Sequence, residues 1–223
     1  MKISGLIFDL DGLLIDSERI YHRVSYKMAD EMKVQLTDEI LALQMGRSPV
    51  ESMQIFIRET GAVGYEAGEM TRWRDEMMLE AFEDELHLMP GALEILKKYH
   101  NRLPIAMATG SPKILMDRAI DLLEIRPYFK VLQPSDGIRL GKPNPEIYLL
   151  AAQKMGVQAD ECIVLEDSSN GSMAGKRAGC RVIAVPNLHT RDHDFSFVDA
   201  VADNLTQASS IILGFLTPPP ASS

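Results

Sequence analysis

Residues 3–12 read ISGLIFDLDG, a short apolar run that ends abruptly in two acids and a glycine. An apolar run of this length is typical of a strand buried on both faces of a parallel sheet. Asp9 and Asp11 follow the run directly, and Leu10 alternates to the opposite face. Ligands of open α/β sheets bind outside the carboxyl ends of the strands, so both acids are predicted to face a ligand. A capped turn on a solvated strand end would explain the same four residues, so the rest of the chain has to decide between the two interpretations.

The rest of the chain alternates between strand and helix patterns. Short apolar runs recur at residues 105–108, 130–132, 163–165 and 182–185. Apolar residues with the three- and four-residue spacing of helices fill residues 92–99, 114–123, 146–155 and 172–178. This alternation predicts an α/β fold with a doubly wound, parallel, Rossmann-like sheet.

Residues 17–88 interrupt the alternation because they contain no strand-like run. Helical patterns cover residues 19–32, 38–43, 50–60 and 66–82, and the segment holds fifteen acidic against eight basic residues. Pro90-Gly91 marks the return to the core, since neither residue suits a helix interior. We therefore expect a small helical cap at residues 17–88, inserted after the first strand, and a discontinuous core at residues 1–16 and 89–223. The stretch TPPPASS at residues 217–223 is expected to fray.

The composition limits the possible partners. A chain of 223 residues with 46% hydrophobic and 25% charged residues is ordinary for a globular protein. Its net charge of −9 gives no attraction for nucleic acid or an anionic membrane, and no run approaches the length of a membrane span. Cys162 and Cys180 lack the spacing of a disulfide framework or a zinc site. We expect a cytoplasmic protein that acts as a monomer.

Two further segments carry polar residues at places where a ligand could meet them. Residues 105–112 read IAMATGSP, an apolar strand followed by Thr109, Gly110 and a Ser–Pro pair that suits the N-cap and first residue of a helix. Such a helix start offers free N–H groups to an anion. GKPNP at residues 141–145 holds Lys142 in a Pro-flanked loop, where a solvated surface lysine is the alternative.

A third strand ends in adjacent carboxylates. Residues 162–168 read CIVLEDS, which places Glu166 and Asp167 at the strand end, although Asp167 would also serve as an acidic N-cap. Because the carboxyl ends of parallel strands share one edge, these acids would join Asp9 and Asp11 in one site. Carboxylates so close repel one another unless a cation joins them, and hard oxygen ligands suit Mg²⁺. The sequence therefore predicts a magnesium and phosphate site with the groups needed for phosphoryl transfer.

Four segments together resemble the motifs of the haloacid dehalogenase superfamily in order and spacing: DLDGLLID (9–16), ATGS (108–111), GKPNPEIY (141–148) and LEDSSNG (165–171). The helical insertion is similar to the cap of the β-phosphoglucomutase-like branch. The segments DSE (16–18), MGR (45–47) and LMPGA (88–92) resemble those of its sugar-phosphate and pseudouridine-5′-phosphate phosphatases. The resemblance implies a Mg²⁺-dependent phosphatase of a small phosphorylated metabolite, a sugar phosphate or a nucleoside monophosphate.

The resemblance also implies a role for each site residue. Asp9 would attack phosphorus and become an aspartyl phosphate, while Asp11 would protonate the leaving alcohol and then activate water. Thr109, the Gly110 N–H and Lys142 would hold the phosphoryl oxygens.

The same resemblance implies a metal site and a cap residue that touches the substrate. The ligands of Mg²⁺ would be the Asp9 carboxylate, the Asp11 backbone carbonyl and the Asp167 carboxylate, with Glu166 nearby as an outer or water-linked partner. Arg47, in the cap, would contribute to substrate selection, although a solvated arginine explains it equally well.

Two other functions compete with hydrolysis. A β-phosphoglucomutase-type phosphomutase carries a cap histidine five residues after the aspartate that corresponds to Asp16, where this chain has Tyr21 and His22 stands one place off. A receiver-like phospho-switch also pairs strand-end acids with Thr and Lys around Mg²⁺, but it has no inserted cap. An inactive scaffold is opposed by the complete set of acids.

Overall fold

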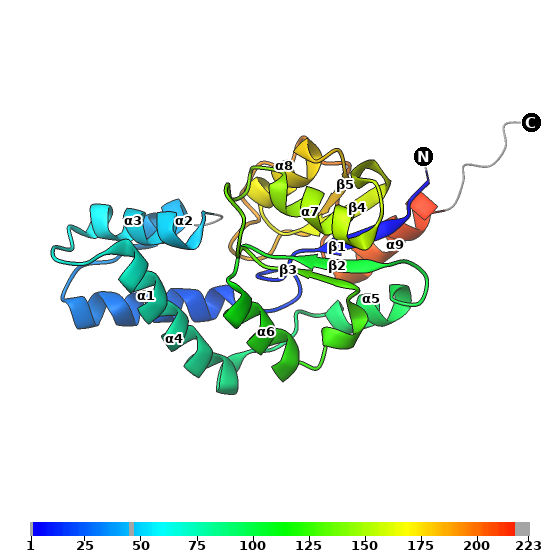
Figure 1. Cartoon of the computed structure of the whole chain (residues 1–223). Helices are drawn as coiled ribbons and strands as arrows, with labels where there is room; N and C mark the ends of the chain where they lie inside the picture. The colour runs from blue at the N-terminus through cyan, green and yellow to red at the C-terminus, as the bar shows by residue number, and fades with distance from the viewer. Residues whose placement is uncertain (1, 45–46, 217–223) are drawn as a thin grey trace, which may run out of the picture.

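Six parallel strands form one sheet in the part of the chain that the computed structural model describes, residues 2–44 and 47–216. Their order is β3-β2-β1-β4-β5-β6, so the chain reverses its direction of travel across the sheet between β1 and β4 (Figure 1). Ligands of doubly wound sheets bind in the crevice at such a switch point. The strands in that spatial order are Val131–Gln133, Ile105–Ala108, Gly5–Phe8, Cys162–Glu166, Arg181–Ala184 and Ala200–Val201.

Helices cover both faces of the sheet because the strands are apolar on both sides. Leu6 and Phe8 of β1 pack into the cluster that includes α5 (Ala92–Tyr99), α6 (Lys113–Leu122) and α9 (Leu205–Leu216). Ile7 points the other way, into the cluster that includes α7 (Glu146–Met155) and α8 (Ser169–Arg177). Two short 3₁₀ turns, Arg126–Tyr128 and Ala159–Glu161, complete the core.

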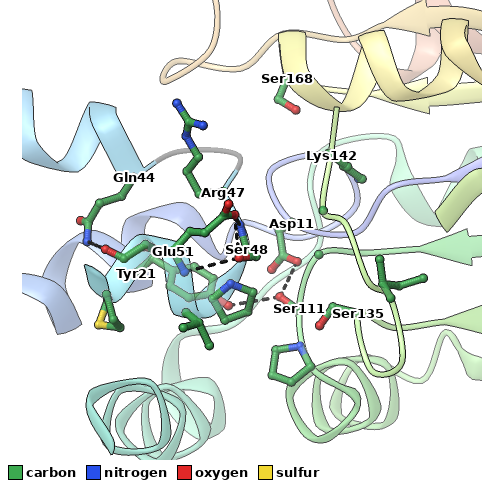
Figure 2. Close-up of a pocket in the computed structure, with 18 of the residues that line it drawn as sticks. Asp11, Tyr21, Gln44, Arg47, Ser48, Glu51, Ser111, Ser135, Lys142 and Ser168 are labelled. Atoms are coloured by element: carbon green, nitrogen blue, oxygen red, sulfur yellow. Dashed lines mark hydrogen bonds between the residues drawn. The ribbon is translucent and has the colours of Figure 1, made fainter. Parts of the chain in front are cut away.

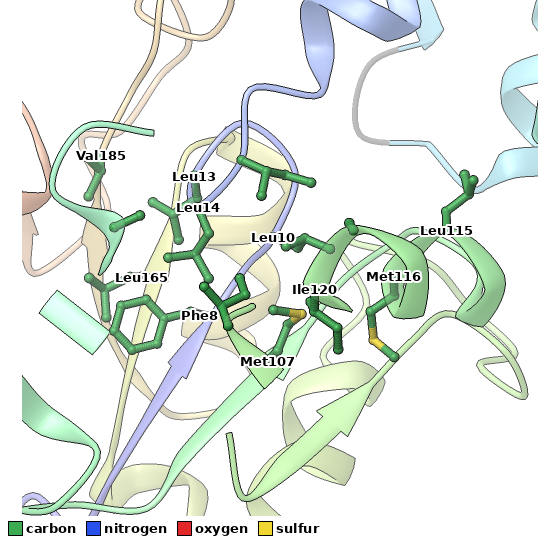
Figure 3. Close-up of a cluster of buried hydrophobic side chains, with 14 of the residues drawn as sticks. Phe8, Leu10, Leu13, Leu14, Met107, Leu115, Met116, Ile120, Leu165 and Val185 are labelled. Carbon is green, nitrogen blue, oxygen red and sulfur yellow. The ribbon is translucent and has the colours of Figure 1, made fainter. Parts of the chain in front are cut away.

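The loop after β1 is anchored by apolar side chains. Leu10 is 1% exposed, and with Leu13 and Leu14 it lies in the buried cluster beside Met107 and Leu165 (Figure 3). Because these leucines point into the core, the polar residues between them are left facing the edge of the sheet.

Of the helices described between β1 and β2 in the sequence, α5 packs against the sheet, whereas four extend away from it in Figure 1: α1 (Glu18–Met32), α2 (Asp38–Gln44), α3 (Pro49–Thr60) and α4 (Ala67–Glu85). Their two connections to the sheet run side by side, since Ile15 and Leu88 form an antiparallel bridge and the Met89 N–H donates to the Leu14 carbonyl at 2.9 Å. Ser48 directly precedes α3 and forms a capping box with Glu51, which explains why the helix begins at Pro49.

The predicted fold class is confirmed, and each of the five predicted strands is present. The short strand β6 and the helix α9 were not predicted. The sequence expectation for Ser111 and Pro112 was wrong: α6 begins at Lys113 with Pro112 at the N-cap position, and Ser111 caps nothing. α8 begins at Ser169, three residues before the predicted start, because Ser168 caps it by accepting from the Gly171 N–H.

Other expectations concern features outside the sheet. Met45, Gly46 and the tail at residues 217–223 lie outside the described residues. No helix in the described ranges is both long and apolar enough to cross a membrane. Cys162 and Cys180 are buried free thiols, as expected from the absence of a disulfide framework.

Candidate active site

Three carboxylates meet where β1 and β4 end. One oxygen from each of Asp9, Glu166 and Asp167 lies within 4.8 Å of the others, and the three residues are 4%, 1% and 3% exposed. Burial raises the pKa of Asp9 well above its ordinary value, against the opposing charge of Lys142. Burial, followed by the charge of Glu166, does the same to the pKa of Asp167. These shifts report a cluster that resists carrying its full negative charge.

Lys142 enters this cluster from the loop before α7. Its ammonium group donates to Asp9 Oδ1 at 2.5 Å and to Glu166 Oε1 at 2.6 Å. Burial acts to lower the pKa of Lys142, but the charges of Asp9 and Glu166 hold it well above its ordinary value. The Lys142 side chain is 10% exposed and lies among these carboxylates rather than in solvent, and its role in binding phosphate stays a prediction.

The same atoms test whether a metal would fit. Three carboxylates and one ammonium leave two negative charges uncompensated. Hard carboxylate oxygens at this spacing suit a hard divalent cation, which would neutralise that remainder. The residues present therefore fit a divalent metal.

Glu166 is held more tightly than its two neighbours. Besides Lys142, it accepts from Tyr148 Oη at 2.9 Å and from both the N–H and the hydroxyl of Ser168 at 2.9 Å. Burial acts to raise the pKa of Glu166, but the charge and hydrogen bond of Lys142 hold it below its ordinary value. A Cβ on Gly171 would overlap the Glu166 carboxylate, lying 2.5 Å from its Oε2, so only glycine leaves room for this carboxylate under α8.

Asp167 is oriented from the opposite side by Asn187, which follows β5. The Asn187 side-chain amide donates to Asp167 Oδ2 at 2.9 Å and to the Gly12 carbonyl at 3.0 Å. Gly12 has a φ of +76°, and a Cβ there would lie 2.6 Å from Asp167 Oδ2. A side chain at Gly12 would therefore collide with the cluster, which adds a steric reason to the turn predicted there.

Asp11 stands apart from the three-carboxylate cluster, and three hydroxyl groups surround its carboxylate. Ser17 donates to Asp11 Oδ1 at 2.8 Å, while Thr109 and Ser111 each donate to Oδ2 at 2.7 Å. The Thr109 hydroxyl also accepts from the Ser111 N–H at 2.9 Å. Thr109 and Ser111, which both follow β2, are therefore bonded to each other as well as to Asp11. Three hydroxyls from two segments of the chain therefore hold the Asp11 carboxylate in place.

Glu18, the first residue of α1, faces the same centre. Its Oε2 is buried and has no hydrogen-bond partner among the described residues. Burial and the nearby charge of Asp11 raise the pKa of Glu18 to about 7. An orphaned buried oxygen in a ligand cavity is available to a donor on a bound molecule.

These residues open into a cavity of about 740 Å³ between the sheet edge and the inserted helices. Gly110 lines it from the core side and Arg47 from the α2–α3 connection, where Arg47 is exposed to solvent. In Figure 2, Lys142 lies on the loop before α7 and Ser168 at the start of α8, whereas Gln44, Ser48 and Glu51 belong to the inserted segment. The volume suits a small metabolite.

The structure thus brings together Asp9, Asp11, Thr109, Lys142, Glu166 and Asp167, with Gly110 and Arg47 on the cavity wall. Sequence reasoning missed Glu18, which faces the same cavity, and the partners that hold the site residues: Ser17, Ser111, Tyr148, Ser168 and Asn187. Asn187 could have been found by applying the strand-end rule to the run at residues 182–185. Tyr148 carried no such signal, because its hydroxyl reaches Glu166 from within a helix.

A doubly wound sheet whose carboxyl edge gathers carboxylates, a lysine and hydroxyls is typical of an α/β enzyme, and its acidic cluster could bind a cation. The family model described as "haloacid dehalogenase-like hydrolase" matches residues 3–179, and the chain belongs to that family.

Named relatives cover almost the same length. The chain is 32% identical over 209 residues to hexitol phosphatase A of Escherichia coli strain K12, covering 93% of this chain and 94% of that protein. It is 28% identical over 184 residues to fructose-1-phosphate phosphatase YqaB of the same organism, covering 82% and 97%. The crystal structure of CbbY from Rhodobacter sphaeroides in complex with phosphate superimposes with a TM-score of 0.84 at 25% identity, covering 92% and 96%. The chain is therefore a hydrolase related to phosphatases over nearly its whole length.

Proposed function

We propose that the protein is a Mg²⁺-dependent phosphatase that hydrolyses a small hydroxylated phosphomonoester through an aspartyl phosphate on Asp9. The observation that carries the proposal is the buried group of Asp9, Glu166, Asp167 and Lys142 at the switch point of the sheet, open to a metabolite-sized cavity. A carboxylate nucleophile, a second acid and positive charge around one phosphoryl group are what such a transfer requires.

In the first half-reaction, the Asp9 carboxylate would attack phosphorus. The bond between phosphorus and the ester oxygen breaks, and Asp11 in its protonated form gives its proton to the departing alcohol. Lys142, the Thr109 hydroxyl and the Gly110 N–H would bind the phosphoryl oxygens. Thr109 is able to do this only by turning its single proton away from Asp11.

In the second half-reaction, Asp11 takes a proton from a water molecule, the water oxygen bonds to phosphorus, and the bond to Asp9 breaks. Inorganic phosphate leaves, and both carboxylates return to their starting states. Mg²⁺, held by the Asp9 and Asp167 carboxylates and the Asp11 carbonyl, would offset the negative charge of the phosphoryl oxygens and the nucleophile. Glu166 is engaged by four donors, which supports a role in fixing Lys142 rather than in direct binding of the metal.

We further propose that residues 17–88 act as a cap over a core of residues 1–16 and 89–223. Closure would exclude bulk water between the two half-reactions. Hydroxylated leaving groups are favoured because the orphaned Glu18 oxygen is an acceptor for a substrate hydroxyl, and because the relatives named above are phosphatases of a hexitol and of fructose 1-phosphate. Arg47 on the cavity wall would help to select the substrate. The free thiols fit a reducing cytoplasm.

The test is a panel of phosphomonoesters incubated with the protein and Mg²⁺, with release of inorganic phosphate as the readout. The panel includes hexitol phosphates, hexose phosphates, pentose phosphates and nucleoside monophosphates. We expect turnover of at least one polyol or sugar phosphate. The mutase alternative is tested with β-glucose 1-phosphate and a trace of the 1,6-bisphosphate: efficient formation of glucose 6-phosphate without phosphate release from any monoester would replace hydrolysis by isomerisation.

A further inference from the structure

A hydrogen-bonded chain links an inserted helix to Asp11. The Tyr21 phenol, on α1, lies 3.1 Å from Ser111 Oγ, and Ser111 Oγ lies 2.7 Å from Asp11 Oδ2 (Figure 2). Ser111 follows β2 and Asp11 follows β1, whereas Tyr21 belongs to the segment inserted between those strands. The chain therefore crosses from the inserted helices to the edge of the sheet through a single hydroxyl.

The direction of the chain follows from counting protons. While Asp11 is ionised, as it is between the two half-reactions, it accepts from three hydroxyls, so the one proton of Ser111 points at Asp11. The Ser111 oxygen is then an acceptor toward Tyr21, and Tyr21 must be the donor. Burial raises the pKa of the Tyr21 phenol further above its usual value, so the proton is present at any working pH.

Tyr21 is itself fixed by the inserted helices. The Arg74 guanidinium, on α4, lies 5.4 Å from the centre of the Tyr21 ring, and Arg74 is 5% exposed and paired with Asp75. A cation over an aromatic face is attractive, and more so when both are shielded from water. The position of the phenol therefore reports the position of α1 and α4 over the site.

When substrate binds, the orientation of Asp11 would depend more on the hydrogen bonds from Ser111 and Tyr21. When Thr109 turns its proton to a phosphoryl oxygen, as the proposed function requires, Asp11 loses one of the two donors on Oδ2. Ser111 is then the remaining donor on that oxygen. The hydrogen bond from Tyr21 polarises the Ser111 hydroxyl and so strengthens its bond to Asp11.

We propose that Tyr21 is a positioning residue that holds the Asp11 carboxylate, through Ser111, in the orientation from which it exchanges a proton with the leaving group. The proposal rests on the proposed function, because it assigns Tyr21 a part in the same acid–base step. It also makes that step depend on α1 lying over the site, so that the acid is oriented when the cavity is covered.

The proposal predicts a dependence on the leaving group. A sugar or polyol phosphate needs a proton on its departing oxygen, so a misplaced Asp11 slows the first half-reaction. p-Nitrophenyl phosphate releases a stable phenolate without that proton. kcat/KM reports the steps up to the first irreversible one and therefore isolates this half-reaction.

The experiment compares Tyr21→Phe with Tyr26→Phe. Tyr26 is on the same helix, exposed, and donates to Asp38 at 2.6 Å, so the control also removes one phenolic hydrogen bond. From the usual worth of one hydrogen bond, we expect Tyr21→Phe to lower kcat/KM for the best sugar or polyol phosphate roughly 3- to 10-fold, with less than about a 2-fold change for p-nitrophenyl phosphate. Tyr26→Phe should change neither. An equal loss on both substrates would overturn the proposal, because it would indicate a general loss of structure or of phosphate binding.

A double-mutant cycle tests the route through Ser111. Because Tyr21 is inferred to act only through that hydroxyl, adding Tyr21→Phe to Ser111→Ala should lower kcat/KM no further than Ser111→Ala alone. Additive losses would overturn the proposal. Thermal unfolding of each variant identifies any that fails to fold. A wild-type protein that hydrolyses no phosphomonoester with Mg²⁺ would refute the proposed function itself. If the wild-type protein is active but Tyr21→Phe lowers kcat/KM equally for both substrates, only the role of Tyr21 is refuted.

Discussion

Replacing Gly171 by alanine should destabilise the protein even though alanine is the better helix former. Gly171 is the third residue of α8, and its backbone lies against the Glu166 carboxylate. An added Cβ would overlap that carboxylate and force it away from Lys142, Tyr148 and Ser168. Lys142 would then remain buried with one partner fewer, since only Asp9 would still pair with it.

The two opposing effects have different sizes. Losing one partner of a buried ion pair is worth about 3–5 kcal/mol of stability, and alanine in a helix recovers about 1 kcal/mol relative to glycine. We therefore expect Gly171→Ala to lower the free energy of unfolding by about 2–4 kcal/mol. Turnover should fall with it, because Lys142 is no longer fixed beside Asp9.

Gly68→Ala is the matched control. Gly68 is in α4, and a Cβ there would meet only the end of Arg72, at 3.9 Å. This variant should be neutral or more stable by up to about 1 kcal/mol. Urea unfolding in EDTA, followed by both far-ultraviolet circular dichroism and fluorescence, measures each variant and checks two-state behaviour. A Gly171→Ala protein that unfolds at the wild-type midpoint or above would refute the claim that Glu166 is pinned beneath α8.

Four further predictions concern the site. Asp9→Asn should abolish phosphate release while the melting temperature changes little, because burial disfavours the Asp9 charge despite Lys142 and the amide oxygen can still accept from Lys142; turnover near the wild-type rate would contradict the proposed nucleophile. Asp11→Asn should lower kcat/KM for a sugar or polyol phosphate by about 10²–10⁴-fold but leave the Mg²⁺-induced rise in melting temperature intact, since the backbone carbonyl remains; loss of that rise would assign the metal to the side chain. EDTA should stop turnover and Mg²⁺ restore it, with Ca²⁺ a poor substitute. The raised pKa values of Asp9 and Asp167 mean that the metal-free fold is favoured at low pH and loses this contribution as the pH rises through those values. Mg²⁺ competes with the same protons, so the rise in melting temperature that it causes should be larger at about pH 8 than at about pH 5, and a smaller rise at the higher pH would contradict the assignment.

The sequence by itself determined the α/β class and the residues that meet at the sheet edge. Short apolar runs with acids immediately after them identify buried parallel strands whose ends converge, and this is a local pattern that needs no coordinates. It was enough to predict that Asp9, Thr109, Glu166 and Asp167 share one site. The division into a cap at residues 17–88 and a core around it stays a prediction. The two-residue strand β6 was missed because a pairing that short leaves no periodicity to detect.

Only the tertiary structure decided how those residues are held. Ser111 looked like a helix cap in the sequence, yet its hydroxyl serves Asp11, because β1 and β2 lie side by side and bring the two residues within 2.7 Å. Gly171 lay just before the predicted helix at residues 172–178, yet α8 includes it and packs on β4 so that its missing side chain leaves the space that Glu166 occupies. Tyr21 contacts Ser111 in the site although the two residues are 90 positions apart in the sequence. Hydrogen-bond partners of this kind depend on how distant segments pack, and a pattern in neighbouring residues carries no information about that packing.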